Sequence, residues 1–191
     1  MVEITNIKVY DLRESVIACR NAMRIAPAEY TDDEFAVSLE RAVKLAKNAT
    51  NSGHANFLKG IRVSFDIKYP NYFSPELQRY GFVDIVCSSS KMHRLSEMVD
   101  AGAFNKYVDS RVVEIVKEYA DRYNAEQTYD NLIWLISNCP QGIELFMRVS
   151  TNYMQLRNIY HQRKNHRLKS DWGAFCKMIE ELPYFEEFIN Q

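Results

Sequence analysis

The sequence contains little glycine, and its glycines are not clustered. Only six glycines occur among 191 residues, and neither GxGxxG nor GxxxxGK[ST] is present. In dinucleotide-binding and P-loop sites, such glycines let backbone N–H groups approach a phosphate closely. Neither kind of nucleotide site is therefore indicated by this sequence.

Cysteine is also scarce and lacks the spacing of a metal site. The cysteines are far apart and form no CxxC pair, and the four histidines are equally dispersed. Zinc sites and disulfide frameworks show characteristic cysteine spacings, whereas scattered thiols are typical of reducing compartments. We therefore expect no metal site and a cytoplasmic protein with free thiols. The residues concerned are Cys19, Cys87, Cys139, Cys176, His54, His93, His161 and His166.

The chain has no long apolar run. No stretch approaches the roughly 20 apolar residues that a membrane-spanning helix requires. The first residues, MVEITNIKVYDL, lack the cationic region and apolar run of a secretory signal. We therefore expect no membrane association.

The overall composition is that of a globular protein, but charge is unevenly distributed. Hydrophobic residues make up 47% and charged residues 26%, and the net charge is only -1. These values and the length predict a single domain over residues 1–191. Between Leu145 and Ser170, however, there is no acidic residue. Such a positive segment usually has an anionic counterpart; its cations are Arg148, Arg157, Arg163, Lys164, Arg167 and Lys169.

Hydrophobic periodicity predicts an α+β fold. Residues 60–69 alternate apolar and polar side chains, which is typical of a strand with one polar face. Strands and helices do not alternate regularly, so we expect a small, mostly antiparallel sheet packed with helices. Further strands are expected at 4–10, at 83–87 as a buried strand, and at 143–149. Helices are expected at 12–25, 31–48, 74–80, 109–138 (two helices broken near Asn124), 151–169 and 170–182.

The helix expected at residues 151–169 carries an arginine on an otherwise partly apolar face. Thr151 is a plausible N-cap, and a 3.6-residue period aligns Leu156, Ile159 and Arg163. A buried guanidinium without a partner is costly. Arg163 therefore meets either an acidic side chain elsewhere in the fold or an anionic ligand, unless its stem snorkels from a solvated basic face.

A serine-rich loop is a second candidate for anion binding. Ser88, Ser89, Ser90 and Lys91 follow the apolar strand expected at 83–87. Hydroxyl and ammonium groups after a strand can cradle a phosphate. The same residues equally fit a turn followed by a helix N-cap at Ser90. If the first alternative holds, Arg163 points into a cleft shared with this loop.

Two blocks of the sequence, roughly 50–95 and 143–175, resemble the flavin-dependent thymidylate synthases. That family has a His before a strand, then Q-x-x-RHR, then a Ser two residues before an Arg, and later a helix with two Asn and an Arg. The residues that match these positions are His54, Arg79, Ser89, Lys91 (for Arg), Asn152, Asn158 and Arg163. The second block also resembles phage-type proteins.

The resemblance implies a thymidylate-synthase-complementing-protein-like fold and sites built between the subunits of a homotetramer. It implies that a dUMP-like pyrimidine nucleotide is bound by Arg79, Ser89, Lys91 and Arg163. It further implies that His54, Asn152 and Asn158 bind FAD, which carries out a reductive methylation without a protein nucleophile. No catalytic residue is assigned.

The chain departs from the family pattern at residues that bind flavin and nucleotide. Tyr80 and Gly81 replace the His and second Arg of RHR, Glu76 replaces the Gln, and Met154 replaces an Arg. The absence of these groups predicts weak or absent FAD binding. The protein is then either a thymidylate synthase-like enzyme of nucleotide biosynthesis or a degenerate homologue.

A function of another class also fits the basic segment. The helix expected at 151–169 interleaves its cations with Tyr153, Tyr160 and His161. Aromatic side chains stack on nucleic-acid bases, and cations follow the backbone. A non-enzymatic nucleic-acid-binding protein is therefore the alternative.

Overall fold

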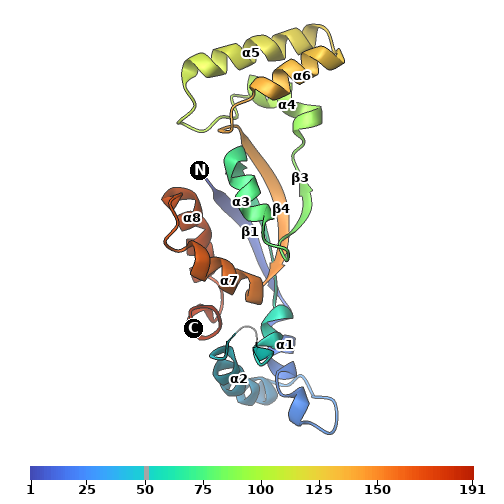
Figure 1. The fold of residues 1–191 in the computed structure, drawn as a ribbon. Helices are drawn as coiled ribbons and strands as arrows, with labels where there is room; N and C mark the ends of the chain where they lie inside the picture. Colours follow the sequence, from blue (N-terminus) through green and yellow to red (C-terminus); the bar gives the residue numbers. More distant parts are fainter. Residues whose placement is uncertain (50–51) are drawn as a thin grey trace.

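The computed structural model describes residues 1–49 and 52–191. The molecule is elongated: a group of helices occupies one end, a twisted sheet the middle, and a helix pair the other end (Figure 1). Helices cover one face of the sheet and leave the other face open. This arrangement confirms the α+β fold class predicted from the sequence.

In the described residues the four strands form one antiparallel sheet. Strand β1 spans Glu3–Tyr10, β2 Arg62–Pro70, β3 Asp84–Ser88 and β4 Glu144–Asn152. Their order is β1-β2-β4-β3, with β2 and β4 in the centre. The alternation in residues 60–69 therefore correctly predicted a strand with one polar face.

The two faces of the sheet have different surroundings because side chains alternate along each strand. Val63, Phe65 and Ile67 of β2 are fully or almost fully buried beneath the helices. On the open face, Arg148 of β4 forms an ion pair with Asp66 of β2 at 3.0 Å. One buried and one solvated face is the usual arrangement in antiparallel sheets.

The covered face supports the main hydrophobic core. It packs against η3 (Asn56–Lys59), α3 (Ser74–Gln78), α7 (Tyr153–Arg163), α8 (Lys169–Glu180) and the C-terminal turn η5 (Phe185–Ile189). Trp172 of α8 is completely buried, and its ring centroid lies 4.7 Å from that of Phe73, in η4 (Asn71–Phe73). The C-terminal residues of η5 contact α7.

At one end of the molecule α1 (Leu12–Ala18) packs against α2 (Asp32–Ala46). The Thr31 hydroxyl accepts a hydrogen bond from the Glu34 N–H and so caps the N-terminus of α2. The helix expected at 12–25 is shorter than predicted, ending at Ala18 before the turn η1 (Asn21–Met23). Arg20 and Arg24 both contact Glu34 of α2, which holds the chain in this turn.

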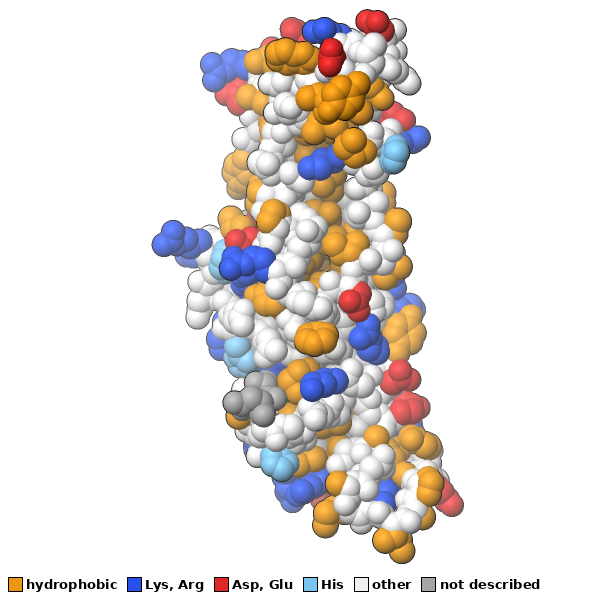
Figure 2. Space-filling model, turned by 45° about the vertical axis from the view of Figure 1, so that its right-hand side comes forward, with side chains coloured by type: hydrophobic (Ala, Val, Ile, Leu, Met, Phe, Trp, Pro, Cys, Tyr) orange, Lys and Arg blue, Asp and Glu red, His pale blue; other side chains and the backbone are white. Residues whose placement is uncertain are grey.

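At the opposite end α4 (Lys91–Asp100), α5 (Ser110–Ala125) and α6 (Tyr129–Asn138) form a separate, smaller core. The break near Asn124 between two helices is confirmed. Val116 and Leu135 are fully buried in this core, whereas Val112 and Trp134 are 37% and 50% exposed. Figure 2 shows hydrophobic side chains gathered on the surface at this end.

Two expectations about the strands are corrected. Strand β3 was expected to be buried, but every residue in it is exposed because β3 is an edge strand beside β4 alone. Strand β4 continues to Asn152, so Thr151 lies in the sheet and its hydroxyl donates to the Phe82 carbonyl. Asn152 is therefore the N-cap of α7, which ends at Arg163 rather than at residue 169.

No helix within the described residues is long and apolar enough to cross a bilayer. The expectation that residues 1–191 behave as one domain concerns cooperative unfolding and stays a prediction.

Candidate functional site

Two cavities lie on either side of the short turn η3. Asn56 and Phe57 line the first, whose volume is about 900 Å³, and Lys59 lines the second, of about 490 Å³. Both volumes are in the range of small-molecule sites. The first cavity opens between α1 and α2, with His54 also in its lining. The second is lined in addition by Arg62, Phe82, Asn152, Met154, Gln155 and Asn158.

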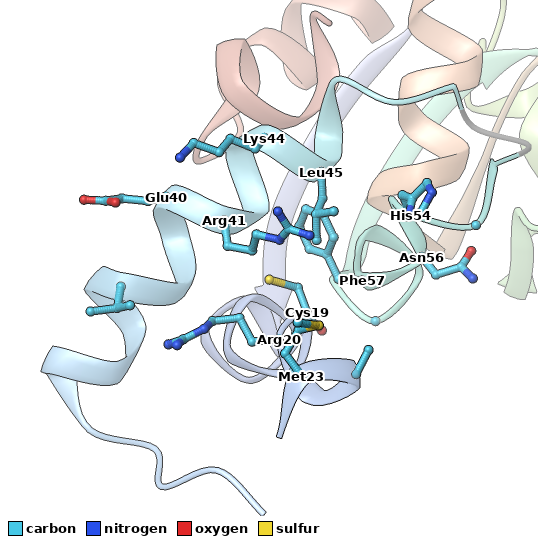
Figure 3. A pocket seen from close by; sticks show the side chains of 16 residues that line it. Cys19, Arg20, Met23, Glu40, Arg41, Lys44, Leu45, His54, Asn56 and Phe57 are labelled. Atoms are coloured by element: carbon cyan, nitrogen blue, oxygen red, sulfur yellow. The ribbon is translucent and has the colours of Figure 1, made fainter. Parts of the chain in front are cut away.

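The first cavity has a positive interior. Figure 3 shows the side chains of Arg41 and Cys19 directed into the space between α1 and α2, whereas Glu40 and Lys44 point away from it. Burial raises the pKa of the Cys19 thiol, and the charge of Arg41 only partly opposes this effect. The thiol is therefore protonated at neutral pH and is a poor nucleophile. Arg41 favours an anionic group in this cavity.

The second cavity combines buried amides with an exposed aromatic ring. The Asn152 Oδ1 accepts a hydrogen bond from the Gln155 N–H at 2.9 Å. Asn152 and Gln155 are only 6% and 7% exposed, while Asn158 is half-buried. Phe82 on the opposite lining is 69% exposed. Amides that donate and accept hydrogen bonds beside a flat ring suit a planar polar ligand.

Arg163 meets an acidic side chain from a distant part of the sequence. Its Nη1 lies 2.7 Å from the Glu76 Oε2, and its Nε donates to the Tyr80 hydroxyl at 2.7 Å. The guanidinium also lies over the Trp172 ring, 4.5 Å from the centroid. Its side chain is 12% exposed. Of the three alternatives considered for Arg163, the structure therefore gives an acidic partner within the fold.

The Ser88–Lys91 loop is held by hydrogen bonds within the chain. The Ser89 Oγ accepts a hydrogen bond from the Phe146 N–H at 3.1 Å, and the Lys91 Nζ donates to the Asn71 Oδ1 at 3.0 Å. Helix α4 begins at Lys91 with Ser90 as its N-cap residue, although no side-chain capping bond forms. The loop thus continues the pairing of β3 with β4 and leads into a helix, as the turn-and-cap alternative predicts.

The residues expected to bind nucleotide lie on different elements of one chain. Arg79 is exposed at the C-terminus of α3, next to Tyr80. Arg163 ends α7, and Ser89 and Lys91 follow β3. Of the residues expected to bind cofactor, Asn152 and Asn158 line one cavity, whereas His54 lines the other, across η3.

Several cavity-lining residues were not identified from the sequence. Gln155 had a usable signal, because it lies three residues after an Asn, the spacing of a helix N-cap and its N3 position. Arg62 lies on the polar side of a clear alternation. Arg41 and Phe82 gave no local signal, since only the tertiary fold places them beside a cavity.

Much of the basic segment is engaged inside the fold. Arg148 is paired with Asp66, and Arg163 with Glu76. Arg157 is 6% exposed, and its Nη1 donates to the Ala46 carbonyl at the end of α2 at 2.6 Å. Burial lowers the pKa of Arg157. The exposed cations that continue this segment are confined to residues 164–169.

Across residues 1–49 and 52–191, no group of three or more His, Cys, Asp or Glu side chains is arranged to hold a metal ion. The four cysteines are free thiols.

Comparisons with known proteins relate the whole chain to one fold. A search of family models found no match, and neither did a search of curated proteins. Among solved structures, a flavin-dependent thymidylate synthase from Helicobacter pylori, complexed with FAD and dUMP, has a TM-score of 0.75 at 16% identity. The alignment covers 99% of this chain and 98% of that chain. A second structure of thymidylate synthase X from Helicobacter pylori, with FAD and dUMP, has a TM-score of 0.73 at 16% identity, covering 99% and 96%.

A UMP/dUMP methylase, PolB from Streptomyces cacaoi, bound with 5-Br dUMP, has a TM-score of 0.68 at 13% identity. The alignment covers 100% of this chain and 94% of the methylase. The chain therefore has the fold of the flavin-dependent thymidylate synthases, which confirms the resemblance inferred from the sequence motifs at the level of fold.

Proposed function

We propose that this protein binds a dUMP-like pyrimidine nucleotide, as a flavin-dependent thymidylate synthase-like enzyme or a degenerate homologue of one. The observation that carries the proposal is the fold match over 99% of the chain to a protein complexed with FAD and dUMP. The match to a methylase bound with 5-Br dUMP points to the same class of ligand. Fold alone does not determine activity, so the proposal also rests on the side chains that would bind the nucleotide.

Arg79, Ser89, Lys91 and Arg163 are the proposed nucleotide-binding residues. Arginine makes bidentate contacts with a phosphate, and lysine supplies a point charge. We propose that these residues meet across the subunits of a homotetramer, as the family resemblance implies. The exposure of Arg79 and of strand β3 leaves both accessible to a neighbouring subunit.

The volumes of the two cavities and the positive charge of Arg41 in the first suit a flavin. Two polar groups of the family motif, the His and the second Arg of RHR, are missing. His54 with Arg41 would hold the anionic part of FAD, and Asn152 and Asn158 would hold its polar ring. When bound, the flavin would supply the hydride for reductive methylation. The Tyr80 hydroxyl is already engaged by Arg163 and Gln162. A hydrogen bond to a charged group contributes about 1.5–3 kcal/mol, so a chain without the His and second Arg of RHR should bind FAD at least roughly a hundredfold more weakly.

Calorimetric titration with dUMP tests the proposal. We expect dUMP to bind at least about tenfold more tightly than deoxyuridine, because the nucleoside lacks the phosphate that the arginines recognise. The absorbance spectrum of the purified protein should show little flavin near about 450 nm. Absence of dUMP binding would contradict the proposal.

The alternative is a nucleic-acid-binding protein that uses the basic segment 151–169. Stacking on bases requires accessible rings. Tyr153 is fully buried and Tyr160 is 8% exposed, and Arg157 and Arg163 are engaged within the fold. We therefore rank this alternative second, and a single-stranded oligonucleotide in the same calorimeter distinguishes the two.

We also propose a cytoplasmic location for this protein. The free thiols of its four cysteines support a reducing compartment.

A further inference from the structure

Two residues that depart from the family pattern contact the same arginine. Glu76 stands where the family has Gln, and Tyr80 stands where it has the His of RHR. In the structure the Glu76 Oε2 lies 2.7 Å from the Arg163 Nη1, and the Tyr80 hydroxyl accepts a hydrogen bond from the Arg163 Nε at 2.7 Å. Both departures therefore act on one cation, which is among the groups proposed to bind the nucleotide.

The ion pair between Glu76 and Arg163 is largely withdrawn from solvent. The two side chains are 30% and 12% exposed, and the Glu76 Oε2 atom itself is buried. The Trp172 ring covers one face of the guanidinium, with its centroid 4.5 Å away. The Tyr80 hydroxyl is held in turn, because it donates to the Gln162 Oε1 at 3.0 Å. Partly buried charges are screened less by water and salt than exposed ones, so the charge of Glu76 acts strongly at Arg163.

A carboxylate at this position has two opposite effects on an anionic ligand. As a hydrogen-bond acceptor it orients the guanidinium, which favours binding. As a negative charge it repels a phosphate that approaches the same cation. A glutamine would provide the first effect without the second, because its carbonyl oxygen also accepts a hydrogen bond from arginine. The charge of residue 76, rather than its shape, therefore affects how tightly an anion binds at Arg163.

We propose that Glu76 is an internal anion that competes with the nucleotide phosphate for Arg163 and so lowers the affinity of the protein for dUMP. A phosphate meets Arg163 either with Glu76 still in place, against its charge, or after the carboxylate has moved away, with loss of the ion pair. Either route weakens binding, so the site fills only at a higher nucleotide concentration than it would with glutamine at residue 76. The inference concerns the regulation of the proposed nucleotide site and rests on that proposed function.

Calorimetric titration of Glu76→Gln with dUMP at fixed ionic strength tests the proposal. The pH is held constant, because the His166 Nε2 lies 3.9 Å from the Glu76 carboxylate. The variant should bind dUMP at least about tenfold more tightly than wild type, or about 1.4 kcal/mol. In an Arg163→Ala background the same substitution should bring no increase.

Two controls separate a local effect on the phosphate from a general change of charge. Glu118→Gln makes the same change of charge on α5, in the separate helical end of the molecule, where Glu118 is exposed (Figure 1). This variant should bind dUMP like wild type. Deoxyuridine lacks the phosphate, so wild type and Glu76→Gln should bind it equally.

Several outcomes would overturn the proposal. Equal or weaker binding of dUMP by Glu76→Gln would show that Glu76 only orients Arg163. An equal gain in Glu118→Gln, for deoxyuridine, or in the Arg163→Ala background would show that the effect does not act through Arg163 on the phosphate. If Glu76→Gln binds dUMP and wild type does not, the function proposed above fails for the natural chain, whereas this inference is supported. If neither protein binds dUMP, both are overturned.

Discussion

At the scale of single residues, the contacts of Arg163 decide whether this motif residue can still bind a ligand. Its ion pair with Glu76 and its position over Trp172 connect α7 to α3 and α8. A guanidinium held in this way is oriented before any ligand arrives, and a preorganised donor loses less entropy on binding. The pairing is therefore compatible with a ligand role in which the anion approaches the remaining N–H groups.

Arg163→Ala should weaken dUMP binding at least about tenfold, which corresponds to about 1.4 kcal/mol. Calorimetry at fixed salt measures this, below the melting temperature of both proteins. Arg167→Ala is the matched control, because Arg167 is exposed and carries the same charge four residues later. Arg157→Ala is unsuitable, since Arg157 is buried against α2. Equal decreases in Arg163→Ala and Arg167→Ala would indicate only a diffuse electrostatic effect.

Tyr72 should make the stability of the folded protein decrease at alkaline pH. Its hydroxyl donates to the Oδ2 of Asp171, which is 1% exposed, at 2.9 Å. Burial, together with Asp171, raises the pKa of Tyr72 to about 12. Because this folded-state pKa is above the unfolded value of about 10, the stabilising contribution is complete below about pH 10. It is lost as the pH rises towards about 12.

Tyr72→Phe should therefore lower the free energy of unfolding by about 1–3 kcal/mol at about pH 8, because Asp171 loses a hydrogen bond. The difference between variant and wild type should shrink at about pH 11. Urea unfolding at both pH values measures it. A difference that stays constant or grows with pH would show that the phenol is not the titrating group.

At the scale of elements, the sequence correctly predicted the features that depend on residues close together in the chain. The Thr31 cap of α2 and the alternation of β2 follow from residues that are neighbours in sequence. The exposure of β3 does not, because an edge position depends on which strand lies beside it. The continuation of β4 through Thr151 likewise depends on its pairing with β2, where Thr151 lies opposite Val63.

In the candidate site, too, some residues could be predicted from the sequence, whereas contacts that depend on the tertiary fold could not. Asn152 and Asn158, which were matched to the family motif, line one cavity. The partner of Arg163 could not be predicted, because Glu76 is remote in sequence and reaches Arg163 only when α3 packs beside α7 and α8. Arg41 and Phe82 became visible as cavity residues only in the folded structure.

Gly173→Ala should stabilise α8. The position is helical and exposed, and a Cβ there meets no neighbouring atom within 4 Å. The expected gain in the free energy of unfolding is about 0.5–1 kcal/mol. Chemical denaturation in phosphate-free buffer measures it, with Gly81→Ala, outside any helix or strand, as the control. A destabilised Gly173→Ala variant would show that the fold itself requires this glycine.

At the scale of the whole molecule, the open face of the sheet and the exposed edge strand β3 leave a large surface available for assembly. The family resemblance of the sequence implies sites built between subunits, so we predict a homotetramer. Sedimentation equilibrium should give a mass near four times the 22.4 kDa of one chain. A monomer at micromolar concentration would contradict this prediction, because no neighbouring subunit could then bring Arg79, Ser89 and Lys91 to Arg163.

A crystal structure of the protein grown with dUMP tests the central claim most directly. We predict one nucleotide per chain, with its phosphate in hydrogen-bonding contact with Arg163 or with Arg79, Ser89 and Lys91 contributed by a neighbouring subunit. Crystals grown at saturating dUMP that contain no nucleotide, or a nucleotide bound away from all four residues, would contradict the account.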